Sequence, residues 1–123
     1  MKRIWIGIGF LVVLLAAGLV VMQVMDHQLG EISDTLEQAA EAPTWERSVT
    51  LANKAEKGWQ SRKKLITALT DHNAIDAIEG LFARLEIYGQ QKDKTEHAAT
   101  CAQLAKAVHA LEENHRLAWY NLL

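Results

Sequence analysis

The chain has 123 residues, of which 50% are apolar, 23% are charged and 7% are aromatic, and its formal net charge is −2. This length allows one small domain, and a single proline with seven glycines leaves little material for the turns of a β-rich fold. The charge balance argues against a nucleic-acid partner. Cys101 is the only cysteine, which excludes an internal disulfide and a cysteine-based metal site.

Residues 4–25 form an apolar segment without a charged side chain. About 20 apolar residues match a hydrocarbon core about 30 Å thick. Lys2 and Arg3 precede the segment, and cations flanking a span favour the cytoplasmic side. We therefore predict an uncleaved anchor over residues 1–27. It crosses the cell membrane once, contacts lipid through residues 4–25, and has its N-terminus in the cytoplasm.

A cleaved signal peptide is the competing interpretation of this segment. Ala16, Ala17 and Gly18 have the small side chains of a cleavage site. Cleavage there would leave the apolar stretch 19–25 as an exposed terminus, so the anchor is favoured. The sequence leaves open whether cleavage ever occurs.

Four segments with helical periodicity follow the anchor, at 28–41, 44–69, from about 73 to 88, and from 93 to the end. Short connections between helices favour antiparallel neighbours. We therefore predict an all-α fold in which residues 28–123 form a small antiparallel bundle of three to four helices outside the cytoplasm. The segment 28–41 could also continue the membrane helix, with Gly30 as a weak point.

Capping residues mark the predicted helix ends. Thr44 and Asn73 are suited to begin the second and third segments, with Asp71 as an alternative to Asn73. Residues 89–92 close the third segment, with Gly89 suited to a helix C-terminus, and Asp93 begins a capping-box pattern. The apolar stripes predict a core that includes Leu29, Ile32, Leu36, Trp45, Val49, Ala52, Ala55, Trp59, Ile66, Leu69, Ile75, Ile78, Phe82, Leu85, Tyr88, Ala98, Cys101, Leu104, Ala105, Val108, Leu111, Trp119 and Leu122.

The stretch LTDHNAID, residues 69–76, is the most enzyme-like feature of the chain. Asp71 and His72 could pair as a base and its orienting carboxylate, or bind a metal together with Asp76. Neighbouring side chains on a helix diverge by about 100°, so the pair does not converge without a special loop. We interpret the stretch mainly as a helix stop, a turn and a helix start.

Histidines elsewhere do not predict a metal centre. Glu112 and His115 form one Glu-x-x-His pattern, whereas a di-iron bundle needs two. His97, His109 and His115 share the last predicted helix, but no pair has the four-residue spacing of a helical metal site. We expect these histidines to be solvated or partly buried, and we predict no catalytic, metal-binding or cofactor-binding residue.

The cations of the second predicted helix suggest a membrane-facing edge. Segment 28–41 is about 21 Å long and segment 44–69 about 39 Å, so a straight antiparallel pairing would push Arg62, Lys63 and Lys64 into the bilayer, which is costly. A tilt or loose pairing would instead place these cations near the headgroups. The predicted interaction surface consists of Trp59, Arg62, Lys63, Lys64, Asp71 and His72.

Several residues in combination resemble a known family. They are the Lys2-Arg3 start with its apolar segment, Trp45, Trp59 followed by basic residues and Leu65, then Asp71-His72 with Ile75, Asp76 and Ile78, and finally Asn121-Leu122-Leu123. The chain is similar over nearly its full length to domain of unknown function 4363, a family of small, single-anchor bacterial proteins common in Firmicutes. The resemblance implies an anchored helical domain and no established activity, cofactor or partner.

These observations predict a non-enzymatic, membrane-anchored helical bundle of the bacterial cell envelope that acts as an interaction or structural module. Its partner would be another envelope protein or a second copy of the chain. The alternative is a small metal-dependent hydrolase that uses Asp71, His72 and Asp76. A sensor that signals through the anchor is disfavoured because only about three residues precede the apolar segment. The sequence leaves open the partner, the biological process and the oligomeric state.

Overall fold

The computed structural model describes the backbone of residues 2–69 and 72–122, with side chains for residues 2–20, 27–68 and 72–114. Within these ranges it contains helices and no strand: α1 (Lys2–Ala40), α2 (Trp45–Leu69), α3 (His72–Gln91) and α4 (Lys94–Leu122). The predicted all-α class is confirmed.

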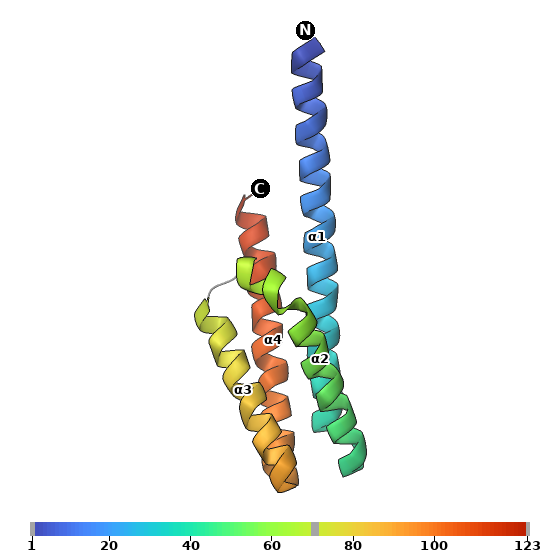
Figure 1. Ribbon diagram of the computed structural model, residues 1–123, viewed down its shortest axis with the longest axis vertical. Helices are drawn as coiled ribbons and strands as arrows, with labels where there is room; N and C mark the ends of the chain where they lie inside the picture. The colour runs from blue at the N-terminus through green and yellow to red at the C-terminus, as the bar shows by residue number, and fades with distance from the viewer. Residues whose placement is uncertain (1, 70–71, 123) are drawn as a thin grey trace.

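α1 is one continuous helix of 39 residues that joins the apolar segment to the bundle (Figure 1). The predicted segment 28–41 therefore continues the apolar helix up to Ala40, as one of the two sequence interpretations had it, and this second half of α1 is itself a bundle helix. Gly30 does not interrupt it. A Cβ atom at Gly30 would lie 3.6 Å from a carboxylate oxygen of Glu112, an ordinary contact distance, so Gly30 faces the side chain of Glu112 on α4.

α1 packs against both α2 and α4, and α3 packs on the other side of α4 (Figure 1). α1 and α4 run antiparallel, and the buried Ser33 hydroxyl donates a hydrogen bond of 3.0 Å to the carbonyl of Ala105. α2 and α3 have much less contact with each other. The bundle is therefore closed around α1 and α4 and more open between α2 and α3.

The core follows the predicted stripes closely. Trp45, Val49, Tyr88 and Ala98 are only half-buried, while Leu51, Ser33, Ser48, Thr100 and His97 are buried although the stripes did not include them. Leu69, Trp119 and Leu122 have side chains outside the described residues. The buried apolar residues are Leu29, Ile32, Leu36, Ala39, Leu51, Ala52, Ala55, Trp59, Ile66, Ile75, Ile78, Phe82, Leu85, Cys101, Leu104, Ala105, Val108 and Leu111.

Helix ends agree with the capping predictions at three of four places. The backbone N–H of Arg47 donates to Thr44 Oγ1 at 3.3 Å, and that of Glu96 donates to Asp93 Oδ1 at 3.2 Å, so Thr44 and Asp93 are N-caps. α3 begins at His72, so Asn73 lies inside its first turn rather than before it.

The prediction that residues 89–92 close α3 is confirmed, because the helix ends at Gln91. Lys92 ends it with a left-handed backbone, φ 55°. The N–H groups of Lys92 and Asp93 then donate to the carbonyls of Gly89 and Tyr88 at 3.3 and 3.0 Å. This arrangement satisfies carbonyls that a helix end otherwise leaves unpaired.

α2 approaches α1 closely at Gly58, where an added Cβ atom would lie 3.3 Å from Cγ1 of Ile32. Beyond this point the last turns of α2 lean away from α1 (Figure 1). The lean relieves the length mismatch between the two segments, because α2 does not continue straight along the apolar half of α1.

Candidate functional site

Trp59 was predicted at an interaction surface, and this is wrong because its side chain is fully buried. Its indole N–H donates to Glu79 Oε1 at 2.9 Å, and its ring stacks on Phe82 with 6.1 Å between centroids. Trp59 therefore links α2 to α3 from inside the bundle. Its apolar neighbourhood explains the position, since a large aromatic ring stabilises the fold mainly by burial.

Lys63 forms an ion pair with the same Glu79 carboxylate. Its ammonium lies 3.0 Å from Glu79 Oε1, the oxygen that also accepts the hydrogen bond from the Trp59 indole. Burial alone would raise the pKa of Glu79, but the hydrogen bonds from Trp59 and Lys63 and the Lys63 charge lower it overall. Lys63 thus serves the contact between α2 and α3 and is only partly available to a partner.

Arg62 and Lys64 remain exposed, and Leu65 lies beside them with 44% of its surface exposed. Arg62 and Leu65 line a small hollow with Gln28 and Leu29, so the two α2 residues lie next to the part of α1 just after the apolar segment.

The LTDHNAID stretch is not assembled into a site by the described residues. Asp71 lies outside them, while His72 and Asp76 are exposed on the first turns of α3. Among the side chains that the structure describes, no group of three or more His, Cys, Asp or Glu residues could hold a metal ion.

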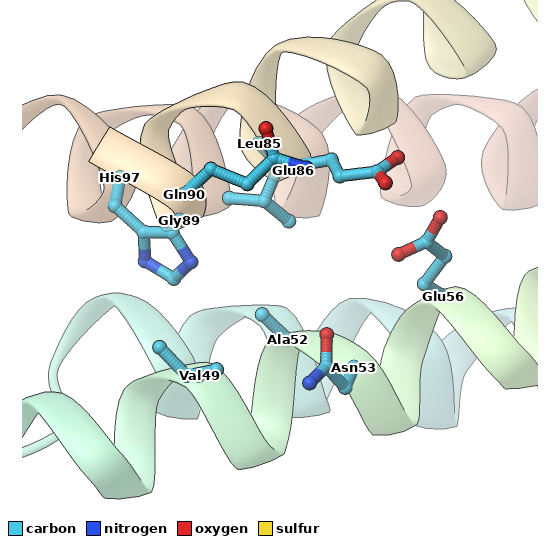
Figure 2. A pocket seen from close by; sticks show the side chains of 9 residues that line it. All are labelled: Val49, Ala52, Asn53, Glu56, Leu85, Glu86, Gly89, Gln90 and His97. Carbon is cyan, nitrogen blue, oxygen red and sulfur yellow. The ribbon is translucent and has the colours of Figure 1, made fainter. Parts of the chain in front are cut away.

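A groove of about 220 Å³ lies where α2 and α3 separate (Figure 2). The carboxylates of Glu56 and Glu86 face each other at one end of it. Burial raises the pKa of Glu56, and the negative charges of Glu86 and Glu79 raise it further. The lining residues are Val49, Ala52, Asn53, Glu56, Leu85, Glu86, Gly89, Gln90 and His97.

His97 closes the other end of the groove and is only 2% exposed. Its Nδ1 lies 3.4 Å from the Ser48 hydroxyl and 3.9 Å from the Cys101 sulfur, and its ring meets Trp45 edge-on at 4.8 Å. The other ring nitrogen points toward the groove (Figure 2). Burial lowers the pKa of His97, which favours the neutral ring. The expectation that His97 is solvated or only partly buried is wrong.

Ser48 and His97 resemble a nucleophile and its base, but their hydrogen bonds have the opposite direction. The Ser48 hydroxyl donates to the carbonyl of Ala39 at 2.8 Å, so its only proton points away from His97. A contact with His97 then requires Nδ1–H to donate to the serine oxygen, whereas a general base must accept the serine proton. The pair joins α1, α2 and α4, and we interpret it as a structural clamp.

The burial of Cys101 agrees with the sequence prediction and accounts for its chemistry. The sulfur is fully buried, and burial raises the pKa of the thiol to about 11. Reactivity requires the thiolate, so this cysteine is inert near neutral pH.

Sequence reasoning missed the groove because its residues come from three helices. The available signal was the spacing of His97 and Cys101, which are four residues apart and therefore on one face of a helix. Extending the buried stripe of α4 back by one turn would have placed His97 in the core. No local pattern indicates that Glu56 and Glu86 meet, since their contact depends on how α2 and α3 pack.

The apolar start and the bundle can now be compared with known proteins. Within the described residues, Lys2–Val20 is the helix segment with the length and composition of a membrane span, and an N-terminal signal sequence would share these properties. No curated protein and no solved structure gave a significant match. The model of one family, the domain of unknown function DUF4363, matches residues 20–122, which include the whole bundle. The chain belongs to the DUF4363 family.

Proposed function

We propose that this protein is a single-pass, membrane-anchored bundle of the bacterial cell envelope that acts as an interaction or structural module without catalytic activity. The continuity of α1 is the observation that carries the proposal. The helix runs without a break from Lys2–Val20, none of which is buried, to the core residues Leu29, Ile32 and Leu36. In this proposal residues 1–27 act as the anchor, and residues 28–123 form the bundle that the anchor holds.

The exposed half of α1 favours an anchor over a cleaved leader. Its apolar side chains surround the helix on every side, which is stable in lipid and unfavourable in water. Cleavage after Ala17 would remove half of a helix whose remainder builds the core. Lys2 and Arg3 support a cytoplasmic N-terminus, which would place the bundle outside the cytoplasm.

The position of Arg62 supports contact between the bundle and the lipid headgroups. Arg62 lies beside Gln28 and Leu29, three to four residues after the apolar segment ends at Met25. This offset amounts to about 5 Å along the helix, and headgroup layers are about 5–8 Å deep on each side of the hydrocarbon core. Arg62 and Lys64 therefore fall at a depth where cations interact favourably with anionic lipids.

Leu65 and Ile87 provide a matched test of this placement. They are the large apolar side chains outside the apolar segment that are substantially exposed, at 44% and 51%, among the described residues. Leu65 lies with Arg62 and Lys64 on what we call the membrane-proximal face, whereas Ile87 lies near the opposite end of α3. A photo-crosslinking amino acid at position 65 of the full chain in native membranes should form lipid adducts, and one at position 87 should not.

Mass spectrometry of the same membrane-extracted protein should find residues 1–20 intact. A mature chain that starts near Gly18 would overturn the anchor. Equal lipid crosslinking at positions 65 and 87 would overturn the membrane-proximal face. Protein adducts at position 87 would identify the envelope partner or a second copy.

The hydrolase alternative rests on Asp71, His72 and Asp76. It predicts a bound metal in the purified protein that is lost in His72→Ala. Elemental analysis of both proteins tests this, and a stoichiometric metal in the wild type alone would overturn the non-enzymatic proposal.

A further inference from the structure

The antiparallel register of α1 and α4 fixes the depth that the C-terminal end of α4 reaches. Ser33 is bonded to Ala105, and Gly30 lies against Glu112. Each residue forward along α4 corresponds to one residue back along α1. Fourteen residues after Ala105, or seven after Glu112, position 119 is therefore level with a position between 19 and 23 of α1.

This level lies within the apolar segment, which extends to Met25. α4 remains helical to Leu122, and Figure 1 shows its C-terminal end at the height of the upper half of α1. The end of α2 leans away from α1, but α4 continues alongside it. If α1 spans a bilayer, the last two turns of α4 cannot avoid entering its surface layer.

The composition of residues 115–122, HRLAWYNL, suits this layer. Trp119 and Tyr120 belong to the two residue types that concentrate at membrane–water boundaries. Arg116 is the only fully charged side chain in the stretch, no acidic residue occurs after Glu113, and a long basic side chain can extend to the headgroups. By the same register Arg116 is level with positions 22 to 26 of α1, at the edge of the apolar segment.

We propose that residues 115–122 of α4 form a second membrane-seated element, which starts at the interface of the bilayer that holds α1, ends within the near leaflet and contacts lipid directly. The inference rests on the proposed anchoring of α1 and adds a second attachment point. Two attachment points fix the tilt of the bundle, because a single span would leave it free to swing. By the same register Leu122, the last residue of α4, is level with positions 16 to 20 of α1, about 8–14 Å past Met25, so the stretch enters the bilayer without crossing it.

A fluorescence quenching experiment on the full chain tests the inference. Single cysteines replace Leu117, Ala118, Trp119 and Tyr120 in turn, which samples every direction around one helical turn. Each is labelled with an environment-sensitive fluorophore in vesicles of phosphatidylcholine and phosphatidylglycerol at a ratio of about 3:1, with lipids that carry a spin label as quenchers. Cys101 can stay, because its buried thiol with a pKa of about 11 escapes labelling.

Two further variants calibrate the signal. Leu14→Cys marks the hydrocarbon core, and Ala99→Cys marks an exposed position of α4 that is level with about position 39 of α1, about 20 Å from the apolar segment. We expect at least one of positions 117–120 to be quenched at least threefold more than position 99. Circular dichroism of each labelled variant verifies that the helices remain.

Quenching at all four positions that equals position 99, with strong quenching at position 14, would overturn the second element and leave the anchor intact. Weak quenching at position 14 would overturn the anchor itself. Fluorophores that are shielded from water yet unquenched by lipid would show that a second copy or another protein covers the end of α4, which also overturns the lipid contact.

Discussion

The two halves of α1 share one helical backbone but face opposite surroundings. In the first half Ile4 and Leu14 are 65% and 54% exposed, and none of Lys2–Val20 is buried. In the second half Leu29 and Leu36 are at most 1% exposed. The first half is apolar on every side, whereas the second carries apolar residues at three- and four-residue spacing. The arrangement of apolar residues, more than their number, determines whether a helix segment is covered by other helices of the protein or left exposed.

The largest expected effect comes from charging the first half of α1. Replacing Leu11 and Leu14 by arginine costs about 5–7 kcal/mol for insertion near the centre of a span. We expect the protein to be lost from the membrane fraction, as measured by fractionation and immunoblotting. The control variant has isoleucine at both positions and should stay in the membrane; if the arginine variant stays as well, the first half of α1 is not a span.

A smaller effect is expected from a cavity in the second half. Leu36→Ala should destabilise the bundle by about 2–5 kcal/mol, because Leu36 is fully buried. Chemical denaturation in mild detergent, followed by circular dichroism, measures the change, and membrane retention should not be affected. Val13→Ala, an exposed position in the first half, is the matched control. Equal destabilisation by both variants would mean that the halves are not distinct.

The buried clamp of Ser48 and His97, which holds the C-terminal end of α1, should make the bundle less stable in acid. Burial lowers the pKa of His97, so the unfolded chain binds a proton more readily than the folded one. The contribution of the neutral His97 ring to the free energy of unfolding is therefore fully present above the pKa of histidine in the unfolded chain, about 6.5. It is lost as the pH falls through the pKa of His97 in the folded protein. Denaturation at pH 7 and pH 5 measures this loss.

His97→Gln should reduce the difference in stability between the two pH values, since glutamine does not titrate in this range. Gln103→Ala, at an exposed position of α4 whose side chain does not titrate, serves as the control and should keep the pH dependence of the wild type. Identical pH dependence in the His97 variant and the wild type would disprove the role of the clamp.

The smallest effect is expected at the end of α3, far from the apolar half of α1. Lys92 has a left-handed backbone, which costs a residue with a side chain about 1–2 kcal/mol. Replacing Lys92 by glycine removes this cost, but part of the gain in folding stability is offset because glycine makes the unfolded chain more flexible. We expect Lys92→Gly to stabilise the bundle by about 0.5–1 kcal/mol in the same denaturation assay. Lys94→Gly, just inside α4, should destabilise instead, and stabilisation by both would contradict the argument.

Local patterns were sufficient to predict the helical class and most of the core. Residues such as Ile75, Ile78, Phe82 and Leu85 lie on one face simply because of helical geometry, and all four are buried. The caps Thr44 and Asp93 were predictable because an N-cap acts within one turn. Trp59 was assigned correctly to the core stripe but wrongly to a surface, since its depth depends on Glu79 and Phe82 of another helix.

Periodicity and capping act over one or two turns, so the residues alone were enough to predict a helical chain, a start that is apolar on every side and amphipathic stripes in the bundle. Only the packing of the helices showed that α1 belongs to both the apolar segment and the bundle. It also decided that Lys63 is paired with Glu79, that Ser48 and His97 form a buried clamp, and that α4 rises beside the apolar segment. These features depend on the register between helices distant in sequence, which is set by how their side chains pack together.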